Sequence, residues 1–183
     1  RLTCLMGECP RPAEVALSLH GCSYCLTTPL STWCDRWFGF SDAEVQALLN
    51  HAGREEYLDD AREWLEGYRF GRAYCSSPER VIGFLGRGCT APVRADLYGY
   101  ADCLSRVVAG WNLERLSDLF DLLEAHGCAE VPLCLGTAEP DVSPDDGMWT
   151  ALYLSGFLTT DMTEEPEYGD RLRALRLPNN ELR

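Results

Sequence analysis

Four cysteines near the start of the chain have the residue type and the spacing of a metal site. The pattern is C-x4-C-x12-C-x2-C, formed by Cys4, Cys9, Cys22 and Cys25. Four thiolates in two pairs could hold a tetrahedral Zn²⁺, and an irregular segment gains most from a structural metal. The first pair is spaced more loosely than usual, and ten Cys in 183 residues make coincidental spacing common. Reduced thiols are therefore the favoured interpretation, and a structural zinc site is the alternative.

Residues for acid–base and nucleophilic catalysis are present, but the sequence does not pair them. His51 and His126 fall near the ends of expected helices, where a cation complements the helix dipole. The adjacent Asp59 and Asp60 are expected on a solvated face rather than in a paired-carboxylate site. The glycine-rich stretch 83–88 follows a helix rather than a strand, so it lacks the context of a dinucleotide loop. The sequence therefore predicts no catalytic residue in this chain.

Lysine is absent from the chain, because all 16 basic residues are Arg. A Walker A loop needs a Lys on the phosphates, and a Schiff-base enzyme needs a Lys amine. A PD-(D/E)XK nuclease usually needs a Lys beside its metal-bound carboxylates. None of these three sites is complete in this sequence.

The chain is acidic, with a formal net charge of −13 and a pI near 4.6. Its summed field repels phosphate backbones, and no cluster of Arg forms a direct nucleic-acid patch. No stretch approaches the roughly 20 consecutive apolar residues of a membrane-spanning helix. The start of the chain lacks the long apolar run of a secretory signal. A cytoplasmic location with reduced thiols is therefore expected.

Helix start and stop signals predict three helices in the first half of the chain. The capping box Ser41-Asp42-Ala43-Glu44 opens a helix that Gly53 closes. A second helix is expected over about 56–66. A third begins at Ser77-Pro78, with Ser as the cap and Pro in the first turn, and ends at Gly86 or Gly88. The stretch 64–71, which joins the second helix to the third, is expected to form a packed corner.

The second half combines further helices with short strands. Apolar spacing predicts helices over about 93–109, 113–126 and 143–156, an extended segment over 131–135, and two strands over 157–160 and 172–177. The expected fold class is mainly α (α+β), with five to six short helices in a lid-like bundle and a C-terminal β-hairpin.

Four motifs occur in the order of a known family. The sequence has Phe-Gly-Phe-Ser at 38–41, Trp at 64 with Gly-Tyr-Arg-Phe-Gly at 67–71 and Ser-Pro at 77–78, Leu-Tyr-x-x-Gly-Phe-Leu-Thr at 152–159, and Pro-Asn-x-Glu-Leu-Arg at 178–183. These motifs resemble the predicted AAA-ATPase-like proteins, in which an ATPase-like domain precedes a PD-(D/E)XK nuclease-like domain. The residues that carry the resemblance are Phe38, Gly39, Phe40, Trp64, Gly67, Tyr68, Phe70, Gly71, Pro78, Gly156, Pro178, Asn179, Glu181 and Arg183.

The resemblance implies a place between two catalytic regions. Residues 1–34 would end the ATPase-like core or form a zinc-stabilised start, 35–156 would be a helical lid-like domain, and 157–183 a β-hairpin connector to the nuclease-like domain. The family's phosphate loop would lie before residue 1, and its nuclease carboxylates and Lys after residue 183. ATP and Mg²⁺ would then be cofactors of the parent protein. The ATPase-like core and the nuclease-like domain would be the partners of this chain, and a homo-oligomer stays open.

Two arginines are candidate nucleotide ligands in this arrangement. Arg69 and Arg72 flank the end of the Gly-Tyr-Arg-Phe-Gly motif, so that either could reach a nucleotide phosphate, and a surface role is the alternative. A second interpretation treats the chain as a metal-stabilised or acidic protein-interaction module that meets a basic partner. A third is a remnant without activity.

Overall fold

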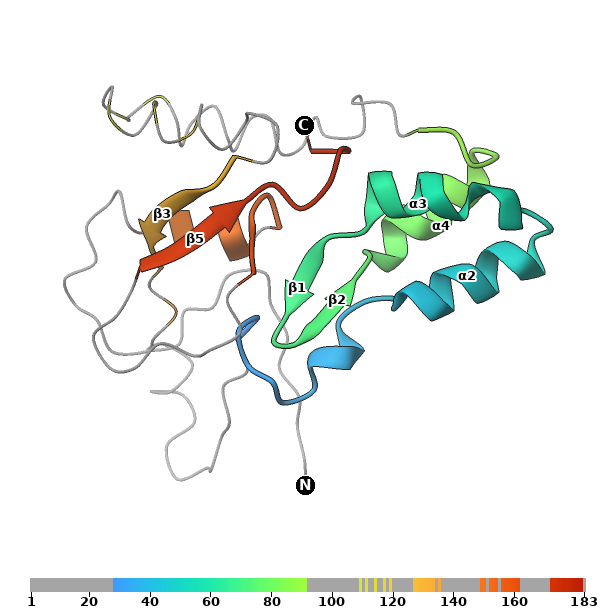
Figure 1. Ribbon diagram of the computed structural model, residues 1–183, viewed down its shortest axis with the longest axis horizontal. Helices are drawn as coiled ribbons and strands as arrows, with labels where there is room; N and C mark the ends of the chain where they lie inside the picture. The colour runs from blue at the N-terminus through green and yellow to red at the C-terminus, as the bar shows by residue number, and fades with distance from the viewer. Residues whose placement is uncertain are drawn as a thin grey trace.

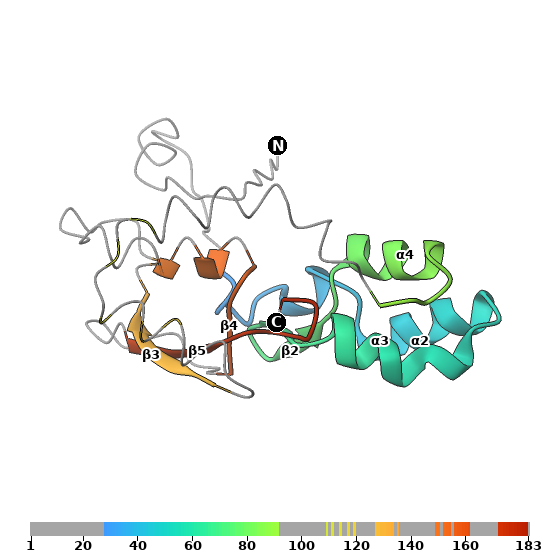
Figure 2. The ribbon, with the colours of Figure 1, turned by 90° about the horizontal axis from the view of Figure 1, so that it is seen from above.

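The fold is known from a computed structural model of the 183-residue chain. The structure describes residues 28–91, 127–133, 149–150, 152–154, 156–161 and 172–182, with the single positions 109, 111, 114, 117, 119 and 135. Figure 1 shows three α-helices at one end, a three-stranded sheet at the other, and the hairpin of β1 and β2 between them. The view from above in Figure 2 has the same order.

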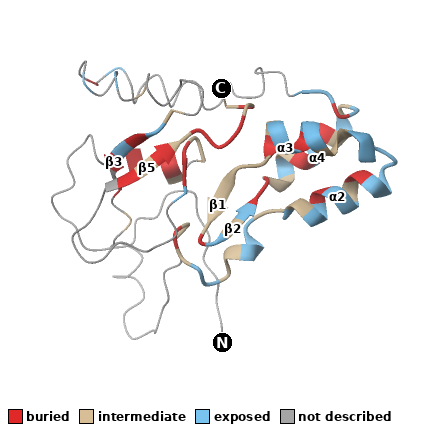
Figure 3. Cartoon of the chain, viewed as in Figure 1, coloured by how far each residue is buried: buried red, intermediate tan, exposed pale blue. Residues whose placement is uncertain are grey.

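The helices form a unit of their own. α2 spans Asp42–His51, α3 spans Leu58–Leu65 and α4 spans Pro78–Gly86, while two short 3-10 helices, η1 at Asp35–Trp37 and η2 at Glu55–Tyr57, precede α2 and α3. The faces that the three helices turn to one another are buried and their outer faces are exposed (Figure 3). On the exposed side of α2 and α3, the guanidinium of Arg62 in α3 donates a bidentate hydrogen bond to the carboxylate of Asp42 in α2, with both N···O distances at 2.8 Å.

The start signal of α2 is confirmed, and that of α4 is confirmed for Pro78 but not for the Ser77 side chain. Ser41 and Glu44 form the expected reciprocal capping box, in which the Ser41 hydroxyl accepts from the Glu44 amide and the Glu44 carboxylate accepts from the Ser41 amide. Pro78 occupies the first turn of α4 as predicted, but the Ser77 side chain makes no capping hydrogen bond. The second expected helix begins with the turn of η2 rather than with α-helix.

The central hairpin consists of β1, Tyr68–Phe70, and β2, Ala73–Cys75, which pair antiparallel with Tyr68 opposite Cys75. A two-residue turn joins the strands, and Gly71 in this turn has φ +52°. Tight hairpin turns favour glycine at such a position. An isolated bridge between Phe40 and Ser76 ties the hairpin to the chain before α2.

The second sheet has the order β3-β5-β4 and is antiparallel throughout. β3 spans Ala129–Pro132, β4 spans Thr159–Thr160 and β5 spans Leu172–Arg176. The sequence-predicted pair of strands near the end of the chain is confirmed as β4 and β5. The apolar extended segment predicted over 131–135 begins in β3, which completes the sheet on the other side of β5.

Two separate hydrophobic cores stabilise the two ends of the fold. The helical core gathers the inward residues of the three helices: Val45, Leu49, Ala61, Leu65, Val81, Phe84 and Cys89. The sheet core gathers residues from distant parts of the chain: Leu30, Trp111, Ala129, Val131, Leu133, Trp149, Leu152, Tyr153, Leu158, Leu175 and Leu177. Leu30 thus belongs to the sheet core, far along the chain from the strands that it contacts. Trp111 and Trp149 pack ring to ring, with centroids 4.8 Å apart.

The expected fold class, a mainly α bundle of five to six short helices with a C-terminal hairpin, is wrong. In the described ranges the named elements are three α-helices, two 3-10 helices and five strands in two sheets, which is an α+β mixture. The main error lies at 64–71, which was expected to be a corner between helices. Tyr68, Arg69 and Phe70 instead form a strand, in which successive half-buried side chains point to opposite faces.

Several predictions fall outside the described residues. Cys4, Cys9, Cys22, Cys25 and Arg183 lie there, as does nearly all of the helix expected over 93–109. The described positions 114, 117 and 119 are helical, as expected for 113–126, and so are 149–150 and 152–154. The domain boundaries after residues 34 and 156 stay predictions. Within the part of the chain that the structure describes, no helix is long and apolar enough to cross a membrane.

Gly67 is expected to tolerate no side chain. Its φ is +124°, and a Cβ added to it would lie 1.9 Å from the carbonyl oxygen of Pro178. Gly67→Ala should therefore lower the free energy of unfolding by about 3 kcal/mol or more, measured by urea denaturation. Gly53→Ala is the matched control, because Gly53 has φ +63° with no atom within 4 Å of the added Cβ.

The Gly53 substitution should cost only the left-handed backbone penalty, about 1–2 kcal/mol. Equal losses for the two variants would show that the contact between Gly67 and Pro178 contributes nothing beyond backbone conformation.

Candidate functional site

A groove of about 260 Å³ lies where the hairpin, the start of α4 and the chain before β4 meet. Residues far apart in the sequence line it, and eight of them belong to the motifs that resemble the AAA-ATPase-like family: Phe38, Tyr68, Phe70, Ser77, Pro78, Gly156, Phe157 and Leu182. The fold thus brings residues of all four motifs to one groove. We take this groove as the candidate site.

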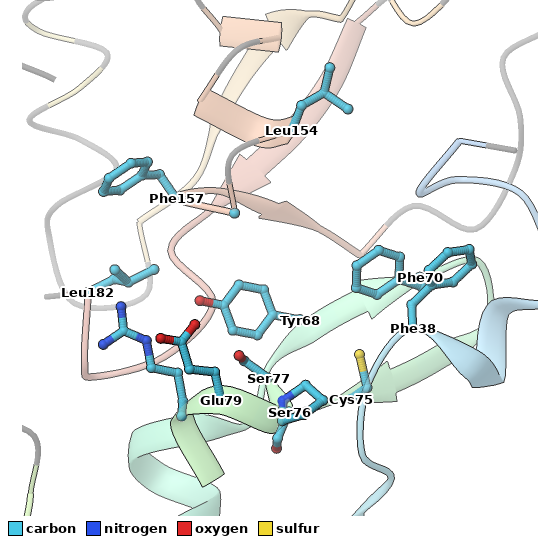
Figure 4. A pocket seen from close by; sticks show the side chains of 13 residues that line it. Phe38, Tyr68, Phe70, Cys75, Ser76, Ser77, Glu79, Leu154, Phe157 and Leu182 are labelled. Carbon is cyan, nitrogen blue, oxygen red and sulfur yellow. The ribbon is translucent and has the colours of Figure 1, made fainter. Parts of the chain in front are cut away.

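The aromatic wall of the groove follows from the alternation of side chains along the hairpin. Tyr68 and Phe70 of β1 and Cys75 of β2 lie on the same face and line the groove. Phe38 stacks on Phe70, with ring centroids 5.1 Å apart and planes inclined by 18°. Figure 4 shows Tyr68 between this stacked pair and Leu182. The result is a preformed apolar surface that is open at one side.

Gly39 allows Phe38 to lie this close to the hairpin. A Cβ on Gly39 would lie 2.8 Å from the Cys75 sulfur and 2.8 Å from the Ser76 carbonyl oxygen. Burial raises the pKa of the Cys75 thiol to about 11. The thiol is therefore protonated at neutral pH, and it acts as a packing group rather than as a nucleophile.

The opposite face of the hairpin carries a charged cluster that joins it to the sheet. The guanidinium of Arg176 in β5 donates two hydrogen bonds to the carboxylate of Asp161, of 2.8 and 2.9 Å. The Tyr74 hydroxyl donates to the same carboxylate at 3.2 Å, and the guanidinium of Arg69 lies 5.0 Å from the centroid of the Tyr74 ring. The backbone amide of Arg69 donates to the hydroxyl of Thr159 in β4. We call Arg69, Tyr74, Asp161 and Arg176 the charged cluster.

The two candidate phosphate ligands differ in their surroundings. The guanidinium of Arg69 donates to the carbonyl oxygens of Gly71 and Asp161 and to the Tyr74 hydroxyl. The side chain of Arg72 is exposed, and its backbone amide donates to the Asp35 carboxylate at 3.0 Å. Arg69 is thus held by acceptors of the protein itself, whereas Arg72 is open to solvent at the turn.

The segment after β5 is attached to the helical unit at three points. Pro178 lies against Gly67, as described above. The Asn180 side chain donates to the Glu63 carboxylate of α3 at 2.8 Å. Glu181, with 4% of its side chain exposed, pairs with Arg80 of α4 at 2.8 Å. We call residues 178–182 the strap, because they fasten the end of β5 to α3 and α4.

Asn179 is the unusual member of the strap. Asn179 is 6% exposed, and neither its amide nitrogen nor its amide oxygen has a hydrogen-bond partner among the described residues. A buried amide without partners costs free energy. Asn179, one of the motif residues, is therefore a buried polar residue at the contact between the strap and the helical unit, and the described residues offer it no side-chain hydrogen bond.

The remaining motif residues support the groove rather than line it. Phe40 and Trp64 pack against the helical core, and Gly71 lies so close to Ser31 that an added Cβ would be 2.5 Å from its carbonyl oxygen. Sequence reasoning missed Arg80, Asp161 and Arg176. The position of Arg80 gave no signal, because it acquires its partner Glu181 only when distant segments meet. No group of three metal-ligating side chains occurs among the residues described here.

Comparison of the chain with protein-family models, with curated proteins and with solved structures finds no match. The arrangement of the groove, the charged cluster and the strap is therefore the basis for a functional proposal. The groove offers an aromatic binding surface with a carboxylate and an ion pair at its edge.

The charged cluster makes the stability depend on pH. Hydrogen bonds from Arg176 hold the pKa of Asp161 below its ordinary value of 3.8. This stabilisation is present above the pKa of the unfolded state and is lost as the pH falls through the lower pKa of the folded state. Because Asp161 is half exposed, Asp161→Asn should lower the free energy of unfolding by only about 1 kcal/mol at pH 7.

Denaturant unfolding of wild type and Asp161→Asn from pH 7 to pH 2 tests this effect, and the difference should shrink below about pH 4. Asp60→Asn, an exposed aspartate of α3, is the control and should change the free energy by less than about 0.5 kcal/mol at any pH. A difference for Asp161→Asn that stays constant with pH would contradict a role for its charge.

Proposed function

We propose that this chain is a non-catalytic lid and connector of a divergent protein similar to the AAA-ATPase-like proteins with a PD-(D/E)XK nuclease-like domain. In this proposal α2, α3 and α4 are the lid, and the sheet with the strap is the connector. The observation that carries it is the strap, in which a motif segment fastens the end of β5 onto two helices through Gly67, Glu63 and Arg80.

The placement of the motif residues supports this proposal. The motifs at 38–41, 67–78 and 152–159 are separated in sequence, yet they meet at one groove, and the fourth forms the strap. Residues with a shared structural task are expected to gather in this way at a joint. Gly39, Gly67 and Gly71 of these motifs each lie close to another backbone carbonyl oxygen, which is a packing role.

The connector role requires that the two cores act together. The ion pair of Arg80 and Glu181 is the strap's charged contact with α4, and the Glu181 carboxylate is buried. Loss of one partner of a buried ion pair is strongly destabilising. The helical core and the sheet core should then lose part of their coupling, because only two of the three strap contacts, Gly67 with Pro178 and Glu63 with Asn180, remain beside the charged cluster.

Arg80→Met is therefore expected to reduce cooperativity. Wild type should unfold in one calorimetric transition, and Arg80→Met should lower the free energy of unfolding by about 2–3 kcal/mol and broaden or split that transition. Arg54→Met is a control, since Arg54 is exposed in the loop before η2. One sharp transition in Arg80→Met with an unchanged midpoint would refute the coupling by the strap.

The reading frame on either side of this sequence tests the placement between two catalytic regions. A GxxxxGK[ST] motif upstream and a carboxylate–Lys cluster downstream are expected. In that longer protein, calorimetric titration with ATP and Mg²⁺ should show weaker binding for Arg72→Ala. Arg69→Ala should mainly lower the melting temperature, because it disturbs the charged cluster.

Flanking sequence without either motif would contradict the placement. ATP affinity that is equal in wild type, Arg69→Ala and Arg72→Ala would remove both arginines from nucleotide binding.

A further inference from the structure

The groove is continuous with a short segment of exposed aromatic residues. Phe38, whose ring forms one wall, is 41% exposed, and its neighbour Trp37 in η1 is 85% exposed. Trp33, just before η1, is 63% exposed. Exposed apolar surface of this kind beside a groove is typical of a binding surface. Trp and Tyr are also the residues that most often dominate binding energy at protein interfaces.

The size of the groove limits what it can hold. Its volume is about 260 Å³. Pockets that enclose drug-sized ligands are larger, roughly 300–1,000 Å³. The groove is also partly open to solvent. One or two side chains fit such a space, whereas a complete nucleotide would remain largely outside it. The size therefore favours a short stretch of peptide over a small-molecule cofactor.

The charge at the groove favours a cationic ligand. Arg80 lines the groove, but Glu181 neutralises it through the 2.8 Å ion pair. The carboxylate of Glu79 is exposed at the groove, and it makes no hydrogen bond or ion pair with any described residue. The chain as a whole carries −13. The faces of Phe38, Phe70 and Tyr68 attract cations in addition, because the ring quadrupole is negative above the plane.

We propose that the groove binds a peptide segment of a partner protein in which an apolar or aromatic side chain stands beside an Arg. The apolar side chain would pack on Phe38 and Tyr68, and the guanidinium would pair with Glu79. This inference goes beyond the lid and connector role, which depends on the strap and the charged cluster. Either one can fail without the other, because Glu79 belongs to neither.

Fluorescence anisotropy with a short fluorescein-labelled peptide whose centre is Arg-Leu-Trp-Arg tests the proposal. The full chain should bind this peptide, and affinity should fall as salt is raised. Phe38→Ala should weaken binding about tenfold or more, as expected for a central aromatic contact. Glu79→Gln should weaken it about threefold to fivefold at low salt, the size of an exposed charge pair.

Matched controls separate the groove from general effects of composition. Ile82→Ala removes an exposed apolar side chain of α4 that lies outside the groove, and Glu55→Gln removes an exposed carboxylate outside the groove. Both variants should bind the peptide like wild type. A peptide with Glu in place of Arg, and one with Ala in place of Leu and Trp, should each bind at least about tenfold more weakly. Glu79 is exposed, so its variant should keep the fold even where Phe38→Ala does not.

Three results would overturn the proposal. The first is equal binding of the Arg and Glu peptides, and the second is equal binding by Glu79→Gln and wild type at low salt. The third is occupation of the groove by something else: ATP and Mg²⁺ that compete with the peptide, or a dimer of this chain, seen by sedimentation, that Phe38→Ala dissociates while no peptide binds.

Discussion

The structure depends on the close approach of the Gly67 backbone to the carbonyl of Pro178. At this point the strand that leaves α3 meets the segment that leaves β5, and only a residue without a Cβ leaves room for the contact. The neighbouring interactions, Asn180 with Glu63 and Glu181 with Arg80, need that same separation. The helical core and the sheet core are each ordinary in composition, so the relation between them depends on this contact and on the charged cluster.

The sequence predicted local features well where a short stretch carried its own signal. The capping box at Ser41 and Glu44 was correct, and so was Pro78 in the first turn of α4, because helix termini are set by residues within one turn. β4 and β5 were correctly expected within the strands predicted over 157–160 and 172–177. The stretch from Tyr68 to Phe70 was misread, because three residues are too few to show a period of two and the flanking glycines suggested a turn.

The candidate site was only partly visible in the sequence. The motif residues pointed to Phe38, Tyr68 and Phe70, and these do meet in the groove. Arg80 was not identified, because an ion pair between residues about a hundred positions apart has no local pattern. Asp161 was not identified, because it joins Arg176 to Tyr74 of the hairpin, which is distant in sequence. Their partners became visible only when the strap and β4 were placed beside the helices and the hairpin.

The two faces of the β1–β2 hairpin require one exact register of its strands. Tyr68, Phe70 and Cys75 face the groove, while Arg69 and Tyr74 face Asp161, so neighbouring residues serve opposite surfaces. A shift of one residue in the register would turn the arginine toward the aromatic wall and the two rings toward the charged side. Both surfaces would be lost together, so an insertion or deletion of one residue in this short hairpin would act as a complete inversion rather than a local defect.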